Sequence, residues 1–514
     1  MWKRSKSANR PSQCCKDHGI RKSCFLLAIT LFVICAVSGF SFYRHHSGRE
    51  TEGSRKISTV SYFPYLRLNK QSLETNVAGE ETPLTGSELD EASESDVASF
   101  LESFDVGSQG DSEDEVQGCN YWQAELKVYM YDLSSEFHYG LIPGYEVEKG
   151  QYWPRNGSEI PEYPGGLYQQ HSPEHWLTSD LLTSNMADRN TACTAFRVAD
   201  WRDADVIFVP FFASLSYNRF GKASEEKRLT DLIKDQNDVL QLKLVKFLEE
   251  QPAWKASGGR DHVFVIHHPN SMQATRNRLR NSLFIVSDFG RYDSEVANIQ
   301  KDVVAPYKHV IPTFDFDDSS FHTRKILLFF QGAIVRKEGG KIRHELYRLL
   351  KDKPGVRFTT GNTALDGFQS ATIGMRSSKF CLNMAGDTPS SNRLFDSIVS
   401  HCVPVIISDD IELPFEDTLD YSNFCIFINS SLALKPGYVI NMLRNVSEEE
   451  WTQLWNQLLL VEHHFEYQHP TRKNDAVNMV WKDIARKLPA INLAINRQRR
   501  YVPKPPGFPY HKLP

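Results

Sequence analysis

The chain has 514 residues and a formal net charge of −5, with 59 Lys and Arg residues against 64 Asp and Glu residues. This length exceeds one ordinary hydrophobic core and favours two folded units with further segments. The charge balance offers no basic excess for a nucleic-acid partner. The sequence contains no G-x-S-x-G, H-E-x-x-H or G-x-G-x-x-G pattern, so hydrolases and Rossmann dehydrogenases lose their usual support.

The N-terminal region predicts a membrane anchor. Residues 23–43, SCFLLAITLFVICAVSGFSFY, are uncharged and long enough for a bilayer-spanning helix. Seven Lys and Arg residues precede them, which predicts a cytoplasmic tail over residues 1–22 and a lumenal remainder. A cleaved signal peptide is the rival interpretation, but its apolar core would be shorter. We therefore expect an uncleaved signal anchor and a type II orientation.

An acidic stem is predicted over residues 44–118. From residue 71 to residue 118 there is no Lys or Arg, while Glu, Asp, Ser and Gly recur. This composition cannot bury enough apolar surface to order the segment. The alternative is an acidic binding tail, but a solvated tether is the simpler interpretation.

Alternating strands and helices predict an α/β unit over residues 119–320. Short β-rich runs end in polar loops, and helical segments such as 224–250 lie between them, which favours a parallel sheet flanked by helices. The predicted strands are 127–133, 205–212, 262–268 and 282–288. A linker with two prolines and an acidic DFDD run follows at 306–322.

The same pattern restarts and predicts a second α/β unit over residues 321–490, with a tail at 491–514. Two such units facing each other would form a cleft. The strands predicted here are 325–332, 356–361, 379–386 and 403–408, and the helices are 343–350, the segment after Pro389, 448–465 and 476–488.

Cysteines and sequons indicate a secretory route. Five cysteines follow the anchor, an odd number that leaves at least one unpaired or bonded to another chain, and their pairing stays open. No zinc-ligand spacing is present. These cysteines are Cys119, Cys193, Cys381, Cys402 and Cys425, and the N-glycosylation acceptors are Asn156, Asn429 and Asn445.

The stretch GDTPSSNRLFDSIVSHCVPVII, residues 386–407, predicts a phosphate site. A hydroxyl-rich loop that enters a helix exposes backbone N–H groups, and Arg393 adds a forked cation. Asp396 lies three residues later, on the same helical face, where it could accept from ribose hydroxyls. The alternative is a capped surface helix with an internal Arg393–Asp396 ion pair.

A second basic loop lies in FFQGAIVRKEGGKIRHELY, residues 329–347. Val335 and Ile342 occupy positions that a P-loop gives to glycine and Ser or Thr, so the stretch is not a P-loop. Gly332, Arg336 and Arg343 could still reach phosphate oxygens. Solvated basic side chains are the alternative.

Two Asp-x-Asp pairs could in principle hold a divalent cation. Asp203 and Asp205 precede their strand, although a ligand is expected at the carboxyl end of a parallel strand. Asp315 and Asp317 are better placed but lie in the predicted linker. Our prediction is therefore that no metal is bound.

Several side chains of the first unit could accept a proton. Three of them, His267, His268 and Asp288, lie at the ends of predicted strands, at the expected site edge of an open sheet, but a core role is the alternative for each. The five candidates are His171, Glu174, His267, His268 and Asp288.

Seven stretches in a fixed order make the chain resemble the exostosin-like glycosyltransferases, over about residues 127–488. The resemblance is strongest to the plant branch that includes the arabinan arabinosyltransferases. The stretches are YMYDL, DADVIFVPFFASLS, GRDHV, VSDFGR, VAPYKHVIP, FFQGAIVRKEGGKIRHELY and SKFCLNMAGDTPSSNRLFDSIVSHCVPVIISDDIELPFEDTLDYSNF.

The resemblance implies a GT-B architecture, with two Rossmann-like domains, and an inverting sugar transfer by a type II protein of the Golgi membrane. The donor would be a nucleotide sugar, with UDP as the expected nucleotide, and the acceptor a cell-wall polysaccharide. The residues implied for the donor are Ser390, Ser391 and Arg393 with Gly332 and Arg336 at the diphosphate, and Asp396 or Glu412 at sugar or ribose hydroxyls.

One departure from the family concerns the catalytic base. Many members have His-Asp after the DHV strand, whereas this chain has His267-His268-Pro269. We therefore expect His268 or Asp288 to act as the base, without a metal. The alternatives are a non-catalytic lumenal partner of another transferase and a metal-dependent GT-A enzyme. The sugar, the polymer and any association with other transferases stay open.

Overall fold

The structure is a computed structural model that describes residues 119–146, 150–186, 193–221, 236–336, 340–361 and 365–500. The predicted tail, anchor and stem lie outside these residues. None of the helices within them is both long enough and apolar enough to span a membrane.

The first sheet has six parallel strands in the order β2-β1-β3-β4-β5-β6. Its central strands are buried over their whole length, as expected for a parallel sheet covered on both faces. The strands are β1 Leu126–Met130, β2 Ala195–Val198, β3 Val206–Val209, β4 His262–Val265, β5 Leu283–Val286 and β6 Val303–Val304. The helices are α3 Pro173–Leu182, α4 Ala213–Phe220, α6 Gln236–Glu250 and α7 Pro252–Ser257.

Alternate residues of these strands build two separate cores. Val206 and Phe208 of β3 belong to the apolar cluster on one face, whereas Ile207 and Val209 belong to the cluster on the other. This follows from the two-residue period of side chains along a strand. The runs VIFV and LFIV are therefore apolar throughout, which is why the sequence predicted them as buried strands.

The second sheet has five parallel strands in the order β11-β10-β9-β7-β8. They are β7 Ile326–Gly332, β8 Val356–Thr360, β9 Ser378–Met384, β10 Val403–Ile407 and β11 Ile426–Phe427. The helices are α8 Lys341–Leu350, α9 Leu365–Arg376, α10 Arg393–Ile398, α11 Ser430–Ala433, α12 Tyr438–Asn445 and α13 Glu448–Val461. The sequence therefore predicted the α/β class and the parallel sheets.

Both sheets share one topology. If the strands of each sheet are numbered from its own start, the first five strands follow the order 2-1-3-4-5, which differs from the 3-2-1-4-5-6 order of the Rossmann fold. In both doubly wound arrangements, ligands bind at the carboxyl ends of the strands where the winding direction reverses. These switch points lie between β1 and β3 and between β7 and β9.

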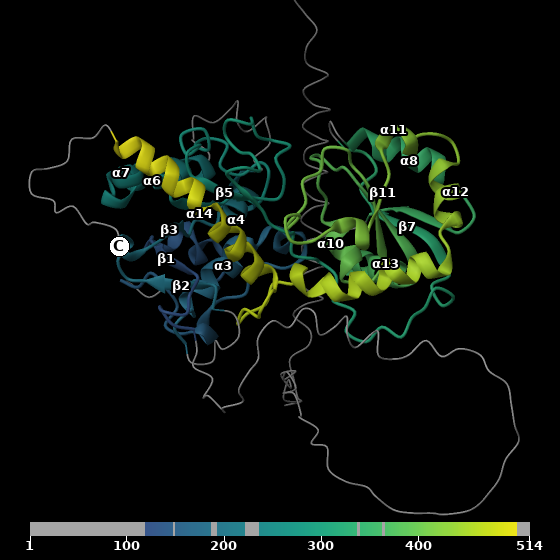
Figure 1. Cartoon of the computed structure of the whole chain (residues 1–514), viewed down its shortest axis with the longest axis horizontal. Coiled ribbons are helices and arrows are strands. Elements are labelled where there is room, and N and C mark those ends of the chain that lie inside the picture. Colours follow the sequence, from purple (N-terminus) through teal and green to yellow (C-terminus); the bar gives the residue numbers. More distant parts are fainter. Residues whose placement is uncertain are drawn as a thin grey trace, which may run out of the picture. The chain divides into compact units, whose positions relative to one another are not determined.

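The last helix corrects the predicted boundaries. Helix α14, Ala476–Arg499, packs against α3 and the first sheet (Figure 1). Residues 476–490 therefore lie with the first unit, although the sequence predicted them in the second. Trp481 is buried, makes an edge-to-face contact with Phe208 and donates its indole N–H to Asp180 Oδ2 at 2.9 Å. The apolar stripe of α14 continues past residue 490, which is why the predicted tail is helical up to residue 499.

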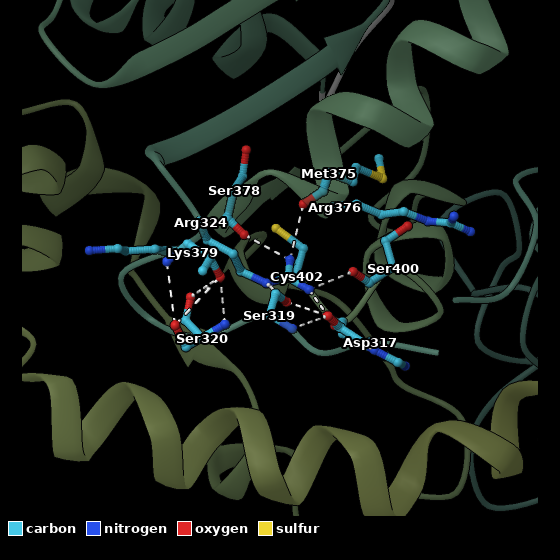
Figure 2. A network of polar contacts seen from close by, with 12 residues as sticks. Asp317, Ser319, Ser320, Arg324, Met375, Arg376, Ser378, Lys379, Ser400 and Cys402 are labelled. Carbon is cyan, nitrogen blue, oxygen red and sulfur yellow. Dashed lines mark hydrogen bonds and ion pairs between the residues drawn. The ribbon is translucent and has the colours of Figure 1, made fainter. Parts of the chain in front are cut away.

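The predicted linker is fixed by a buried ion pair. Arg324 donates to Asp317 Oδ2 at 2.7 Å and to the Ser378 carbonyl oxygen at 3.0 Å (Figure 2). His401 contacts Asp317 Oδ2 with Nδ1 and Glu462 with Nε2, each at 2.8 Å. These charges therefore join the segment between β6 and β7 to the second sheet.

Two disulfides settle most of the pairing that the sequence left open. They join Cys119 to Cys193 and Cys381 to Cys402, and Cys425 is a buried free thiol. The asparagines of all three sequons, Asn156, Asn429 and Asn445, are exposed.

Candidate functional site

A pocket of about 410 Å³ lies where the carboxyl ends of both sheets meet. The second sheet contributes the loop after β7 and the loop at residues 386–393, between β9 and α10. The first sheet contributes Tyr217 of α4 and residues 268–270 after β4. The pocket thus lies at the switch point of the second sheet, between β7 and β9, and faces the loops after β4 and β5 of the first sheet.

Four arginines make one part of this pocket strongly cationic. Arg291, Arg336, Arg343 and Arg393 all line it, and among the described residues Asp387 is the one carboxylate in the lining. Arg336 Nη1 lies 3.3 Å from Asp387 Oδ2, and both side chains are more than one-third exposed. Such a weak, solvated pair leaves a net positive charge that suits a diphosphate.

Arg343 is buried and holds the loop at residues 386–393 in place. Its buried guanidinium donates to the carbonyl oxygens of Ala385, Met384 and Ala333 and to Ser391 Oγ. Burial, together with the charges of Arg336 and Arg393, lowers the pKa of Arg343. The sequence predicted Arg343 as a phosphate ligand, whereas the structure shows it holding β9 and the loop in place.

Asp396 does not reach the pocket, which corrects the prediction that it binds sugar or ribose hydroxyls. It is fully buried at the start of α10, where it pairs with Arg393 and accepts from the Val310 backbone N–H at 2.8 Å and from Asn392 Nδ2 at 3.0 Å. The ion pair that the sequence offered as the alternative is therefore present. Arg393 still lines the pocket, and its Nε donates to the Gln331 carbonyl oxygen at 2.9 Å.

Asp288 is occupied by the loop of the opposite sheet, which corrects its assignment as a base. Its Oδ2 accepts from Thr388 Oγ1 at 2.6 Å and from Ser390 Oγ, and Tyr307 Oη lies 2.9 Å from Ser390 Oγ. Gly290 explains the close approach, because a Cβ there would lie 2.3 Å from Pro389 Cδ. Asp288 therefore positions the loop that carries Ser390 and Ser391.

His268 lines the pocket, but its ring is oriented as a donor. Its Nδ1 accepts the Asn270 backbone N–H at 3.1 Å, so the neutral ring carries its proton on Nε2. Another predicted proton acceptor of the first unit, Glu174, accepts from the backbone N–H groups of Ser214 and Leu215, and burial raises its pKa to about 8. Glu174 thus fixes the start of α4.

Glu412 and the Asp-x-Asp pairs lie apart from the pocket. Glu412, predicted at sugar hydroxyls, is outside the lining. Asp205 accepts from the Lys127 backbone N–H, Asp317 is held by Arg324, and Asp203 and Asp315 are exposed. In the described ranges, no cluster of three or more His, Cys, Asp or Glu side chains could hold a metal.

Of the predicted donor residues, Gly332, Arg336, Arg343, Ser390, Ser391 and Arg393 come together in the pocket, and Asp396 and Glu412 do not. The sequence interpretation missed Arg291, although it ends the VSDFGR stretch after β5. A cation in the loop that follows a strand was the signal that could have found it.

Comparisons with known proteins show which family the chain belongs to. Residues 123–443 match the model of the Exostosin GT47 domain. The probable arabinosyltransferase ARAD1 of Arabidopsis thaliana is 39% identical, over 76% of this chain and 85% of the relative. The probable glycosyltransferase At3g07620 of the same plant is 27% identical, over 69% and 67%. A crystal structure of Anabaena Alr3699/HepE with UDP-glucose is 10% identical, with a TM-score of 0.33 over 71% of this chain and all of that chain.

Proposed function

The chain belongs to the exostosin GT47 family of glycosyltransferases, and we propose that it transfers a sugar from a UDP-sugar to a cell-wall polysaccharide with inversion. The observation that carries this proposal is the pocket at the carboxyl ends of both sheets, with four arginines around the loop at residues 386–393. Two doubly wound sheets with a pocket at their carboxyl ends also support a GT-B architecture. The name of the relative ARAD1 favours an arabinosyl donor.

The diphosphate would lie against the loop between β9 and α10. Ser390 and Ser391 offer hydroxyls, and Arg336 and Arg393 offer forked cations. Gly332 has no side chain, so the backbone at the end of β7 could lie close to the diphosphate. Negative charge grows on the leaving diphosphate in the transition state, so fixed guanidinium groups lower the barrier most there. These cations can supply the charge stabilisation that a metal would otherwise give.

Asn392 replaces Asp396 as the acceptor for a ribose hydroxyl. It lines the pocket and is 7% exposed. Its Nδ2 binds Asp396, whereas its Oδ1 has no hydrogen-bond partner within the part of the chain that the structure describes. A buried acceptor without a partner is costly, and a bound hydroxyl would satisfy it.

The acceptor polysaccharide would enter from the first sheet. Tyr217 and His268 form an aromatic and polar wall there, with ring centroids 4.4 Å apart. The acceptor hydroxyl would attack the anomeric carbon from the side opposite the diphosphate. A single displacement of this kind inverts the configuration.

We place the protein in the Golgi membrane as a type II protein, with its catalytic part in the lumen. The uncharged segment 23–43 with basic residues before it supports this orientation. Two disulfides and three exposed sequon asparagines support an oxidising secretory compartment. Glycosylation at Asn156, Asn429 and Asn445 and contact with other transferases remain part of this proposal.

Donor binding and transfer test the proposed function. Saturation-transfer NMR with a panel of UDP-sugars identifies the donor, and transfer to pectic, xyloglucan and xylan oligosaccharides then identifies the acceptor. The anomeric configuration of the product reports inversion. A chain that binds none of the UDP-sugars would instead be a non-catalytic partner, and a loss of activity with EDTA would contradict the metal-independent mechanism.

A further inference from the structure

Three histidines from two segments meet at the wall of the pocket. His171 ends the short helix η4, Gly166–His171, and His267 and His268 follow β4. The ring of His171 lies 5.1 Å from that of His267 and 4.6 Å from that of His268, centroid to centroid. His171 and His268 line the pocket, whereas His267 is fully buried behind them.

The proton position on His267 follows from its partners. Its Nε2 lies 3.1 Å from the Ala305 carbonyl oxygen, which can only accept, so Nε2 carries a proton. Complete burial lowers the pKa of His267 to about 4, which keeps the ring neutral at ordinary pH. A neutral imidazole has one proton, so Nδ1 of His267 has an unprotonated lone pair.

This lone pair fixes the neighbouring ring. His171 Nδ1 lies 2.9 Å from His267 Nδ1, and since the latter accepts, His171 must donate from Nδ1. Neutral His171 then has its acceptor nitrogen at Nε2. His268 has the opposite arrangement, because its Nδ1 accepts from Asn270 and its Nε2 carries the proton.

We propose that His171, and not His268 or Asp288, is the catalytic base of the transfer, with His267 as its positioning residue. This inference rests on the proposed glycosyltransferase function. The carbonyl oxygen of Ala305, His267 and His171 form a chain in which each member orients the next, as the third group of a catalytic triad orients its histidine.

The step conserves atoms and electrons. The O–H bond of the acceptor hydroxyl breaks, and its proton moves to His171 Nε2. The oxygen lone pair forms the new bond to the anomeric carbon, and the bond from that carbon to the diphosphate oxygen breaks with its electrons on UDP. The imidazolium of His171 then keeps its Nδ1–H bond to His267 and later releases the Nε2 proton to water.

His171 also lies close to the loop that would hold the diphosphate. Its ring centroid is 5.1 Å from that of Tyr307, whose hydroxyl contacts Ser390 Oγ at 2.9 Å. The rings of His267, His268 and Tyr307 thus lie against His171, and burial raises the pKa of Tyr307 far above the working range. None of these three brings a carboxylate next to Nε2.

Kinetics of the full chain test this inference. His171→Gln should lower kcat by about 10²- to 10⁴-fold, the usual share of general acid–base catalysis, with UDP affinity within 3-fold of wild type. His268→Gln should lower kcat by less than about 10-fold, because a donor and not the base is removed. His344→Gln, on the exposed face of α8, is the matched control.

A spectroscopic readout tests the geometry without turnover. In ¹⁵N-histidine NMR of the full chain, His171 should carry its proton on Nδ1, and His267→Ala should shift this tautomer and the acid limb of the rate profile. A proton on Nε2 of His171 would overturn the inference. So would a His171→Gln protein with wild-type kcat, and in that case UDP binding and transfer by the wild type would leave the proposed function intact.

Discussion

Asp288 and Thr388 lie 100 positions apart in the chain and in loops that follow strands of different sheets, yet Thr388 Oγ1 donates to Asp288 Oδ2 at 2.6 Å. The contact holds the loop between β9 and α10 against the carboxyl end of the first sheet. The two sheets therefore share one site through a hydrogen bond that involves a buried carboxylate, and this bond can be tested.

Replacing Asp288 with Ala should lower both stability and donor affinity. The change leaves the hydroxyls of Thr388 and Ser390 without their acceptor, which should cost about 1–3 kcal/mol in the free energy of unfolding. Urea unfolding and UDP titration measure the two effects. Glu295→Ala, at an exposed carboxylate nearby in the chain, should change neither. Equal UDP affinity in Asp288→Ala and wild type would contradict this role.

Gly290→Ala tests the same contact between the loop after β5 and the loop between β9 and α10, because it places an extra methyl group between them. A Cβ at residue 290 would lie 2.3 Å from Pro389 Cδ, so the two loops must move apart. Overpacking of this kind costs about 1–3 kcal/mol, and we expect a lower melting temperature with weaker UDP binding. Gly144→Ala makes no new contact but has φ of +80°, so its effect should appear in stability alone. Unchanged UDP binding by Gly290→Ala would show that the loops are not coupled.

His401 should make the stability depend on pH. Burial alone would lower its pKa, but hydrogen bonds to Asp317 and Glu462 outweigh burial and raise the pKa. Its contribution is therefore complete below the ordinary His pKa of about 6.5 and is lost as the pH rises through the higher folded pKa.

The matched variant is His401→Asn, because His401 has a φ of 52°, which Asn tolerates. Urea unfolding from pH 6 to pH 9 should show that the free energy of unfolding of the wild type exceeds that of His401→Asn by less and less as the pH rises. A constant difference between the two proteins over this range would contradict a charged His401.

Peptide mapping without reduction tests the cysteine pairing. We expect Cys119 linked to Cys193 and Cys381 linked to Cys402. Cys425 should react with iodoacetamide only after unfolding, because it is buried and burial raises its pKa. Rapid labelling of Cys425 in the folded protein, or its recovery in a disulfide, would contradict the structure.

Most of the strands that the sequence predicted have long apolar runs, although β8, VRFTT, was predicted without one. Strand β2 was missed because AFRV carries Arg197, whose guanidinium contacts Asp132 at 2.8 Å, and β6 is only two residues long. The basic and hydroxyl residues of the second sheet were also predictable, since they follow strands and precede helices. Their location at the carboxyl ends of the strands follows from the α/β pattern.

The remaining errors concern contacts between distant segments. Asp396 has the spacing of a ribose ligand, but only the fold shows that Val310 and Arg393 occupy it. The tautomer of His171 depends on the carbonyl oxygen of Ala305, because this oxygen fixes the proton of His267 and His267 in turn fixes the proton of His171. The return of α14 to the first sheet is likewise decided by packing and not by local sequence.

Calorimetric titration of UDP into the full chain tests the central claim that this pocket binds a nucleoside diphosphate. Wild type should bind, and Arg336→Ala should weaken binding by about 1.5–3 kcal/mol with little change in unfolding, because both side chains of its pair with Asp387 are more than one-third exposed. Arg393→Ala should weaken binding as well, but it also leaves Asp396 without its cation and so lowers stability. Arg348→Ala, on the exposed face of α8, is the control and should bind UDP like wild type. No UDP binding by wild type, or equal affinity in Arg336→Ala and Arg348→Ala, would contradict this claim.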